Sequence, residues 1–216
     1  MRETTEMTGM VLLSAPSGDY DRRLVLLTRE RGKITAFAHG ARKQGNSLMA
    51  ASRPFSFGTF VLYEGRSAYN LQSAQITNYF DQLSSDIEGS CFGSYFMEVA
   101  AYLSQENMDG TELLMLLYQS LRALTRESIP NRLVRRVFEL RAMVVNGEYS
   151  QTPPGAVSDS CRYTWEYVIF TPVQSLYTFI LKEETLHEFE HAVETVRRRF
   201  LPHKFRALEI LETMLG

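Results

Sequence analysis

The segment GKITAFAHGARKQGNS, Gly32–Ser47, joins a run of β-branched and aromatic residues to a basic loop flanked by glycine. Its first half predicts a strand, which Gly40 ends just before Arg42 and Lys43. Between residues 29 and 53 the chain has six Lys or Arg and a single acidic residue, Glu30, so this stretch carries a net charge of +5. A strand that ends in such a loop presents cations on a surface, and nucleic acid is a common polyanion that fits one.

Similar apolar runs lie on both sides of this strand and predict five strands in the first third of the chain. Short segments that each contain glycine separate them. Five strands with no helix long enough for a βαβ crossover predict a small antiparallel barrel or sandwich, and five strands at this size suggest a barrel of the OB or SH3 type. The long polar connection from Gly40 to Arg53 is compatible with the binding loop of an OB-fold. The expected strands cover residues 9–15, 23–28, 33–39, 55–64 and 68–76.

The chain becomes helical in character after Asp81, where apolar residues recur at the three- and four-residue spacing of amphipathic helices. Pro130 opens one of these helices and Gly147 ends it. Extended runs on either side of Pro172 predict a small β excursion near residues 163–182. The expected organisation is therefore α+β, with a five-stranded OB-fold nucleic-acid-binding domain over residues 1–80 followed by a mainly α-helical domain over residues 81–216.

The length, composition and charge distribution indicate what kind of protein this is and which part of it could bind a polyanion. The chain has 216 residues, 44% of them hydrophobic, and a formal net charge of -2. Residues 1–80 contain ten Lys/Arg and six Asp/Glu, a net of +4, whereas the remainder contains thirteen and nineteen, a net of -6. A polyanionic partner would therefore bind the first part.

Cysteine content and hydropathy bear on the compartment. Two cysteines are too few for a disulfide framework or a four-cysteine metal site. No run approaches the roughly 20 apolar residues of a membrane span, and the N-terminus lacks an apolar signal segment. We therefore expect a cytoplasmic protein with no membrane partner.

The sequence HEFEH, His187–His191, satisfies the H-E-x-x-H pattern of zinc proteases and also its inverted form. Both histidines lie away from the expected apolar face of their helix, and the continuation that would supply a third ligand in metzincins is missing. We therefore expect a solvated polar face and no metal at His187 and His191. A zinc metalloprotease is kept as the alternative from the enzyme class.

No other motif predicts catalysis. There is no G-x-S-x-G nucleophile motif and no phosphate-binding loop in the sequence. Cys91 lies among apolar residues at a helix start, where a buried structural thiol is expected. The sequence therefore predicts a protein that is not an enzyme and needs no cofactor.

Cations and aromatic residues are interleaved along the expected barrel. Proteins that bind single strands combine a basic groove with aromatic rings on which bases stack. The candidate stacking residues are Phe37, Phe55, Phe57 and Tyr63. An aromatic ring in a small barrel is more often part of the core than a stacking platform, so a core position is the alternative for each of them. The expected DNA-binding residues are Arg22, Lys33, His39, Arg42, Lys43 and Arg53.

The expected helix after Pro130 places Arg132, Arg135 and Arg136 on one exposed stripe opposite its apolar face. Such a stripe could bind an acidic peptide or DNA phosphate. From spacing alone, a solvated face partly neutralised by Glu139 is the simpler interpretation.

Arg141 lies differently on this helix, within the arc that Val134 and Val145 extend. A guanidinium among apolar neighbours needs a partner that compensates its charge. Glu98, at the margin of an earlier helix face, is the candidate, and we expect a structural salt bridge between Arg141 and Glu98.

Six segments, taken in order, resemble the RecO family of recombination mediators. The opening TGMVLLSAPSGDYDR resembles the family's first strand and G-[ED]-x-D-R turn, and GKITAFAHGARK resembles its G-K-x-x-A-x-x-x-G-A-R signature. RRVFELRAMVVNGEY, Arg135–Tyr149, is similar to the family's R-x-F-E-L-R-L-L-x-x-x-G-Y segment. The remaining matches are Arg53–Phe55, SYFMEV at Ser94–Val99 and KFRALEIL at Lys204–Leu211.

The resemblance implies an OB-fold followed by a helical domain, in a non-enzymatic protein that binds single- and double-stranded DNA and anneals complementary strands. It also implies that the protein acts with RecR to help RecA replace single-strand-binding protein, in association with the bacterial nucleoid. The acidic-hydrophobic C-terminal tail of single-strand-binding protein would contact the helical domain, which favours a partner-binding role for Arg132, Arg135 and Arg136. A protein-only interaction module built on an OB scaffold is the other alternative.

Two departures from the family pattern concern single sites. Many relatives carry a four-cysteine zinc site after the F-E-L helix, whereas this region keeps only Cys161, so no structural zinc is expected. The terminal motif has Arg206 and Ala207 where the family favours Lys and Ser, which leaves that pair without an assigned role.

Overall fold

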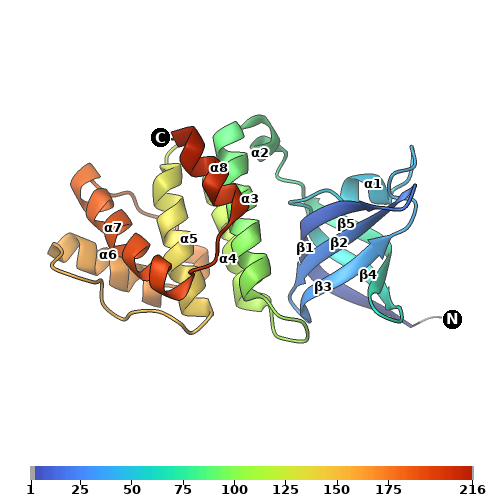
Figure 1. The fold of residues 1–216 in the computed structure, drawn as a ribbon, viewed down its shortest axis with the longest axis horizontal. Helices are drawn as coiled ribbons and strands as arrows, with labels where there is room; N and C mark the ends of the chain where they lie inside the picture. The colour runs from blue at the N-terminus through green and yellow to red at the C-terminus, as the bar shows by residue number, and fades with distance from the viewer. Residues whose placement is uncertain (1–2, 216) are drawn as a thin grey trace. The chain divides into compact units, whose positions relative to one another are not determined.

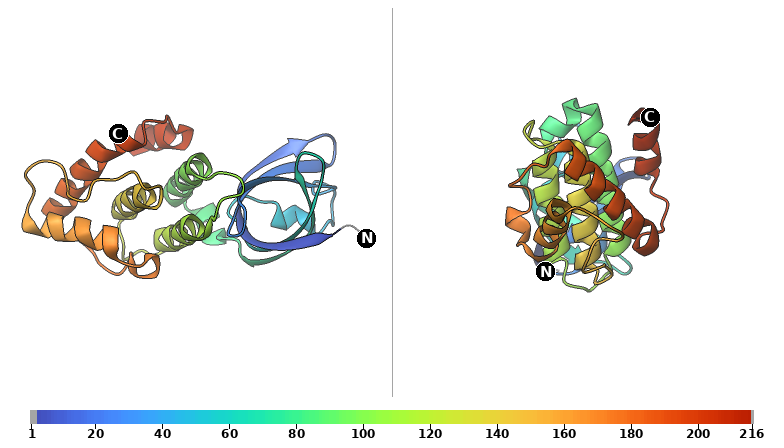
Figure 2. Two further views of the ribbon diagram at one scale, coloured as in Figure 1. Left: turned by 90° about the horizontal axis from the view of Figure 1, so that it is seen from below. Right: turned by 90° about the vertical axis from the view of Figure 1, so that its left-hand side faces the viewer.

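The computed structural model describes residues 3–215, which form a five-stranded barrel followed by a helical region (Figure 1). The strands close into a ring in the order β1-β2-β3-β5-β4, and the left panel of Figure 2 shows this ring end-on. The predicted α+β fold with an N-terminal OB barrel is therefore confirmed. The strands are β1 (Thr4–Ser17), β2 (Asp21–Thr28), β3 (Gly32–Ala38), β4 (Phe57–Glu64) and β5 (Tyr69–Asn78), and the one-turn helix α1 (Leu48–Ala51) lies between β3 and β4.

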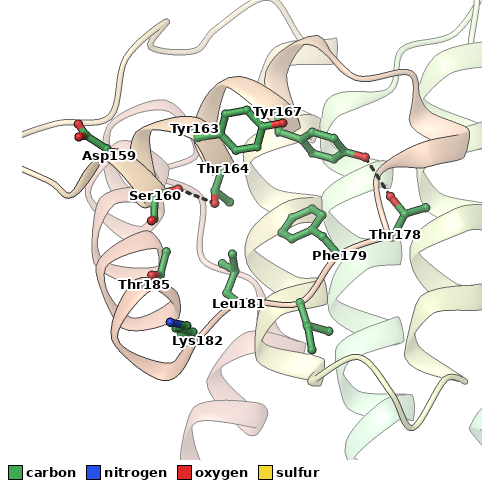
Figure 3. A pocket seen from close by; sticks show the side chains of 11 residues that line it. Asp159, Ser160, Tyr163, Thr164, Tyr167, Thr178, Phe179, Leu181, Lys182 and Thr185 are labelled. Carbon is green, nitrogen blue, oxygen red and sulfur yellow. Dashed lines mark hydrogen bonds between the residues drawn. The ribbon is translucent and has the colours of Figure 1, made fainter.

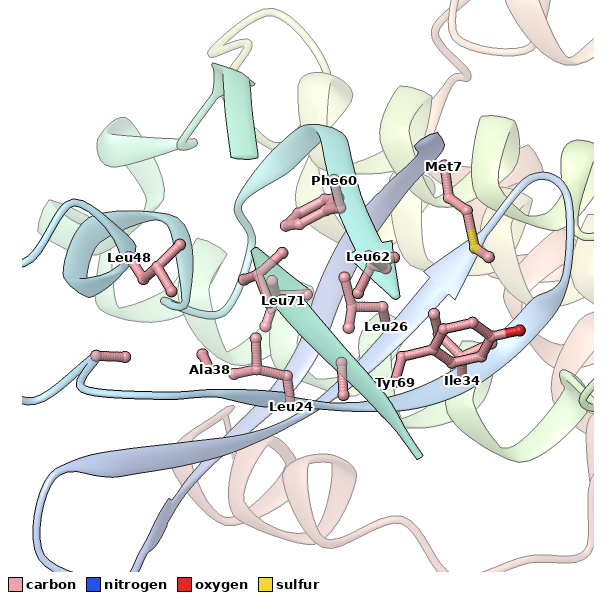
Figure 4. Packing of buried hydrophobic residues seen from close by; sticks show 13 residues of the cluster. Met7, Leu24, Leu26, Ile34, Ala38, Leu48, Phe60, Leu62, Tyr69 and Leu71 are labelled. Atoms are coloured by element: carbon pink, nitrogen blue, oxygen red, sulfur yellow. The ribbon is translucent and has the colours of Figure 1, made fainter. Parts of the chain in front are cut away.

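Alternate side chains of each strand fill the barrel (Figure 4). In β3 the residues Ile34, Ala36 and Ala38 are buried, whereas the alternate residues Lys33, Thr35 and Phe37 are only half-buried. Leu24 and Leu26 of β2, with Phe60 and Leu62 of β4, complete the same cluster. Full burial stabilises the fold by about 1.5–3 kcal/mol for each large apolar side chain, so this alternation fixes which face of β3 is left for binding.

One contact of the barrel is parallel, which the prediction of a purely antiparallel barrel missed. β3 and β5 pair in parallel over a short stretch, Ala36 opposite Tyr69 and Phe37 opposite Asn70. All other strand pairs are antiparallel. The ring closes through this parallel contact, and because the contact is short it leaves the first half of β3 without a strand partner on that side.

A loop from the helical region covers this open edge of β3. The amide N–H of Lys33 donates to the carbonyl of Gln105 at 3.1 Å, and Asn107 N–H donates to the Arg31 carbonyl at 2.9 Å. Gly32 permits this approach because its φ is +61° and a Cβ there would lie 2.2 Å from the Gln105 carbonyl oxygen. The loop between α3 (Ile87–Leu103) and α4 (Thr111–Leu124) thus acts as a sixth, strand-like element of the barrel.

The chain forms two compact units that are interleaved in sequence. The first takes in the chain up to Asp81 together with Met97–Leu114, and the second takes in Gln82–Phe96 and the chain from Met115 onward. Helices α3 and α4 therefore contribute residues to both units. The other helices are α2 (Asp81–Ser85), α5 (Asn131–Val145), α6 (Asp159–Phe170), α7 (Glu183–Phe200) and α8 (Arg206–Leu215).

Aromatic side chains hold the second unit together. Helices α5, α6 and α7 pack against one another. Phe138 of α5 stacks on Phe96 with a centroid separation of 4.2 Å, and Trp165 of α6 meets the ring of Phe189 edge-on at 6.2 Å. None of the helices in residues 3–215 combines the length and the apolar character needed to cross a bilayer.

The β excursion predicted near residues 163–182 is wrong. This stretch contains most of α6 and a turn of 3-10 helix at Val173–Ser175, and no strand is described within it. The buried residues of α6 include Cys161, Trp165, Val168 and Ile169, which recur at helical spacing. The aromatic and β-branched composition of the stretch suggested strands, but tertiary burial of one helical face overrides that propensity.

Candidate nucleic-acid interface

Two loops lock together at one end of the barrel. The β1–β2 turn, Gly18–Tyr20, meets the loop that begins at Gly40. The amide N–H of Arg42 donates to the Tyr20 carbonyl at 2.9 Å, and its guanidinium Nη1 donates to the Gly18 carbonyl at 3.1 Å. The Lys43 ammonium lies 4.8 Å from the centroid of the Tyr20 ring. We call the surface formed by residues 18–21 and 39–43 the basic corner.

Asp21 fastens the basic corner through both of its carboxylate oxygens. Oδ1 accepts the amide N–H of Gly40 at 2.8 Å, and Oδ2 lies 2.7 Å from Nδ1 of His39. Nε2 of His39 lies 3.0 Å from Oδ1 of Asn70 on β5. Three strands are thereby tied to the start of the loop through Asp21, His39 and Asn70, which we call the clasp.

The clasp favours a protonated His39. Both imidazole nitrogens face oxygen acceptors, so both donate only in the charged form. The hydrogen bonds to Asp21 and Asn70 raise the pKa of His39 above its ordinary 6.5, although partial burial acts in the opposite direction. The hydrogen bonds from Gly40 and His39 lower the pKa of Asp21 below its ordinary 3.8. Both shifts favour the ion-paired form of the clasp, which lies beside two further cations, Arg42 and Lys43.

The structure brings together His39, Arg42 and Lys43 from the predicted DNA-binding set. Arg42 and Lys43 are both exposed, and the side chain of His39 is 58% exposed. Arg22 is close by, because it pairs with Ala38 across the β2–β3 ladder. Its side chain is half-buried and donates from Nη1 to the Ser14 hydroxyl at 3.1 Å, so it lies behind the corner rather than on its surface.

Lys33 is not part of this surface. It lies at the opposite end of β3, six residues or about 20 Å from His39 along the strand. Its ammonium donates to the carbonyl of Ala101 at 2.7 Å, in the last turn of α3, and Glu106 lines the same hollow of about 350 Å³. A cation at a helix C-terminus is stabilising there, so the observed role of Lys33 is to fasten α3 to the barrel.

Arg53 and the predicted stacking rings differ in how far solvent reaches them. Arg53 follows α1, is exposed, and reaches Asp81 only at 3.5 Å, so this ion pair leaves most of its charge available. Phe37 lies beside His39, with ring centroids 6.5 Å apart and an angle of 18° between the planes. The four rings are half-buried and belong neither to the buried core nor to the exposed surface: Phe37, Phe55, Phe57 and Tyr63.

Sequence reasoning missed four residues of the interface. Tyr20, Asp21 and Asn70 could not be assigned because their contacts join segments that are distant in sequence. Arg23 could have been found, since the alternation of β2 places Leu24 and Leu26 inside and Arg23 outside. It is exposed and pairs with Phe37 on the neighbouring strand.

Comparison with known proteins shows which family this chain belongs to. Residues 1–80 match the family model described as "Recombination protein O N terminal", and residues 84–152 match "Recombination protein O C terminal". The chain belongs to the RecO family. The first match covers the whole barrel with the basic corner, and the second reaches from α2 to just beyond α5.

Three relatives, each named DNA repair protein RecO, show how far the RecO similarity extends. The protein of Alkaliphilus metalliredigens is 34% identical over 72% of this chain and 62% of its own length. That of Acetivibrio thermocellus is 21% identical over 96% of both chains. That of Clostridium novyi is 29% identical over 64% of this chain and 54% of its own. The matched region thus spans little more than half the length of two of these relatives.

The exposed arginine stripe predicted on α5 is wrong for two of its three members in this RecO-family chain. The side chains of Arg135 and Arg136 are 10% and 12% exposed. Both pair with the fully buried Glu139, through Arg135 Nε at 2.9 Å and Arg136 Nη1 at 2.7 Å. Only Arg132 is substantially exposed, and it pairs with Glu183 at 2.6 Å.

We call the group around Glu139 the ion cluster; it consists of Arg135, Arg136, Glu139, Glu194 and Arg197. Burial alone would raise the pKa of Glu139, but the guanidinium groups of Arg136 and Arg135 outweigh it and lower the pKa. Tyr95 also donates to Glu139, at 2.8 Å. Glu139 on α5 itself and Glu194 on α7 supply the counter-charges, and the burial that α7 imposes could not be found from the spacing on α5 alone.

Arg141 is buried on the same helix and donates from Nη1 to the carbonyl of Val168 at 3.4 Å and to that of Ile169. Backbone carbonyls at the end of α6 thus accept from the guanidinium that needed a partner. The pairing of Arg141 with Glu98 stays a prediction.

The HEFEH segment has a structural role at Glu188. Its carboxylate accepts the N–H and the hydroxyl of Ser158, and the Ser158 hydroxyl in turn caps the start of α6 by accepting from Cys161 N–H. His187 and His191 are both exposed. Within residues 3–215 no group of three His, Cys, Asp or Glu is placed to hold a metal ion.

A hollow of about 740 Å³ opens beside α6 in the second unit (Figure 3). Tyr163, Tyr167 and Phe179 line it, and the Tyr167 hydroxyl lies 2.9 Å from that of Thr178. Its lining includes one acidic residue, Asp159, and one basic residue, Lys182, so charge does not select a ligand for it.

Proposed function

We propose that this RecO-family chain is a non-enzymatic DNA-repair protein whose barrel binds the DNA backbone through the basic corner. The observation that carries the proposal is the locking of Arg42 and Lys43 onto the β1–β2 turn at the open end of an OB barrel. Loops of this kind in OB-folds bind oligonucleotides. The cations contact phosphates rather than base edges, so the affinity is independent of sequence and applies to single- and double-stranded DNA.

The structure supports some of the predicted DNA-binding residues as phosphate contacts more strongly than others. Arg42, Lys43 and His39 form the proposed phosphate contacts, and Arg53 extends them along the loop after β3. Arg22 supports the corner from behind through Ser14. Lys33 is left out of the contact surface because the Ala101 carbonyl already holds its ammonium.

The wider role follows the family. We propose that the protein anneals complementary strands and acts with RecR to help RecA replace single-strand-binding protein, in the cytoplasm at the nucleoid. The C-terminal tail of single-strand-binding protein would contact the helical region, where Arg132 is the accessible arginine of α5. An annealing assay on complementary strands coated by single-strand-binding protein tests this role, and failure to anneal them would contradict it.

Salt dependence tests the DNA-binding proposal directly. If about four cations neutralise phosphates, the logarithm of the affinity for a single strand falls with the logarithm of salt concentration at a slope of roughly -3. Replacing two of them in the double variant Arg42→Ala, Lys43→Ala lowers the magnitude of this slope by about 1.4 and weakens binding to every sequence alike.

The matched control for this test is the double variant Arg162→Ala, Lys204→Ala, which removes the same charge from two exposed positions of the second unit. We expect it to bind like the unchanged protein. A flat salt response, or equal binding by the basic-corner variant and the unchanged protein, would overturn the proposal.

A further inference from the structure

The Tyr20 ring lies on the surface of the barrel, outside its buried core. It is 55% exposed, whereas the apolar residues that face the barrel interior are buried. Exposing a large ring to water is unfavourable for folding, and Tyr is enriched where proteins bind partners. Tyr20 lies in the turn that Arg42 and Lys43 contact, which suggests a role in binding for the exposed ring.

The surroundings of Tyr20 hold it in place before any ligand arrives. Its carbonyl accepts the amide N–H of Arg42 at 2.9 Å, so its backbone is tied to the basic loop. The neighbouring Asp21 is the centre of the clasp. The ammonium of Lys43 lies 4.8 Å from the ring centroid, a cation–π contact that fixes the orientation of the ring. A pre-positioned ring loses little entropy when a ligand stacks on it.

The chemistry of this arrangement selects the ligand. An aromatic ring in contact with an ammonium, in a corner that also holds a guanidinium, suits a flat π-system joined to an anion, and a nucleotide is such a group. In a duplex the faces of the bases are already stacked on their neighbours. Only an unpaired base can therefore reach the ring while its phosphate contacts Arg42 or Lys43.

We propose that Tyr20 is a stacking platform for an unpaired nucleobase, and that it adds a preference for single-stranded DNA to the backbone binding of the basic corner. This inference rests on the proposed function, because the cations bring the strand to the ring. It divides the corner into two parts: Arg42 and Lys43 hold any DNA backbone, and Tyr20 distinguishes a strand with free bases from one without.

The first test compares Tyr20→Ala and Tyr20→Phe in the full-length chain, using oligothymidine, an abasic oligonucleotide of the same length and a duplex. We expect Tyr20→Ala to bind oligothymidine roughly 5- to 100-fold more weakly and to bind the abasic strand and the duplex as before. Tyr20→Phe keeps the ring and should bind all three as the unchanged protein does. A loss for Tyr20→Ala that is equal on all three ligands would overturn the inference in favour of a structural role.

The second test reads the stacking directly. Trp165 is the only tryptophan in the sequence and is fully buried, so a Tyr20→Trp variant adds an exposed fluorophore over a background that ligands do not reach. Oligothymidine should quench the new emission, whereas the abasic strand should leave it unchanged. No quenching by oligothymidine at concentrations that saturate binding would contradict stacking at this position.

These outcomes separate the inference from the proposal on which it rests. If Arg42→Ala, Lys43→Ala weakens binding but Tyr20→Ala does not change affinity for oligothymidine, stacking fails and backbone binding stands. If neither variant changes binding, both fail.

Discussion

Asp21 shows how a single acidic residue can favour the binding of a polyanion. Its carboxylate lies in the basic corner, where its own charge repels DNA, yet it holds Gly40 and His39 through two hydrogen bonds. Because the pKa of His39 is raised, the stabilisation from this ion pair is complete below pH 6.5 and is lost as the pH rises through the raised pKa. The pKa of Asp21 is lowered, so its carboxylate stays charged throughout this range.

The variant Asp21→Ala separates the two effects of this residue. If the positioning role dominates, its DNA affinity should fall by about fivefold, since losing the hydrogen bonds that order the loop amounts to roughly 1 kcal/mol. Asp19→Ala is the matched control, because Asp19 is an exposed acid in the same turn, and its removal should leave affinity equal or slightly higher. Filter binding or fluorescence anisotropy measures both. A gain in affinity for Asp21→Ala would show that charge outweighs positioning.

At the scale of elements, the α3–α4 loop and the β2–β3 turn depend on each other. Gly32 and Gly110 allow them to approach, because a Cβ at Gly110 would lie 2.2 Å from the Thr28 carbonyl oxygen and one at Gly32 would meet that of Gln105. The amide N–H of Gly110 also donates to the Arg29 carbonyl at 3.0 Å. The open edge of β3 is therefore covered by backbone-to-backbone contact, with no room for side chains at these two positions.

Two glycines with the same backbone conformation test this contact. Gly32 and Gly18 have φ values of +61° and +60°, but a Cβ at Gly18 would meet nothing within 4 Å. Gly18→Ala should lower the free energy of unfolding by about 1 kcal/mol, the conformational cost alone. Gly32→Ala should lower it by more than about 2 kcal/mol, because the loop must also move. Denaturant unfolding measures the difference. Equal effects of the two substitutions would mean that the α3–α4 loop moves aside from a Cβ at residue 32 at no cost in stability.

The sequence predicted elements better than it predicted contacts. The strands were found because β-branched runs end at glycines, and Gly40 and the cations after it lie where the motif placed them. The residues near 163–182 have the composition of strands, and it takes the packing of the helices to reveal the helical spacing of the buried residues in α6. The clasp and the ion cluster join residues from separate elements, and no periodicity within one element encodes such contacts.

At the scale of the whole molecule, the two parts of the sequence differ in how far their charges are exposed or neutralised. The positive excess of the first part includes exposed groups at the basic corner. In the second part, much of the charge on α5 and α7 is neutralised in the ion cluster, around the fully buried Glu139. The sign of a region in sequence therefore says little about which of its charges a partner can reach.

The ion cluster makes the second unit sensitive to acid. Because the pKa values of Glu139 and Glu194 are lowered from 4.5, the stability that they contribute is present above pH 4.5 and is lost as the pH falls through the lowered values. Glu139→Gln removes the buried carboxylate that Arg135 and Arg136 share and should lower the free energy of unfolding at pH 7 by about 3–5 kcal/mol.

The control is Glu183→Gln, at the largely exposed partner of Arg132, which should cost less than about 1 kcal/mol. Circular dichroism of urea unfolding between pH 7 and about pH 2 measures both variants across the range in which this stability is lost. Stability of Glu139→Gln equal to that of the control would contradict the role assigned to the cluster.

The covered edge of β3 also governs how the chain can be divided. Cutting after the barrel, at residue 81, would remove Gln105 and the loop that pairs with the start of β3. The strand would then expose unpaired amide and carbonyl groups, and an uncovered sheet edge of this kind recruits strands from other molecules. A fragment that ends there should self-associate more than the whole chain does, although it contains every residue of the basic corner.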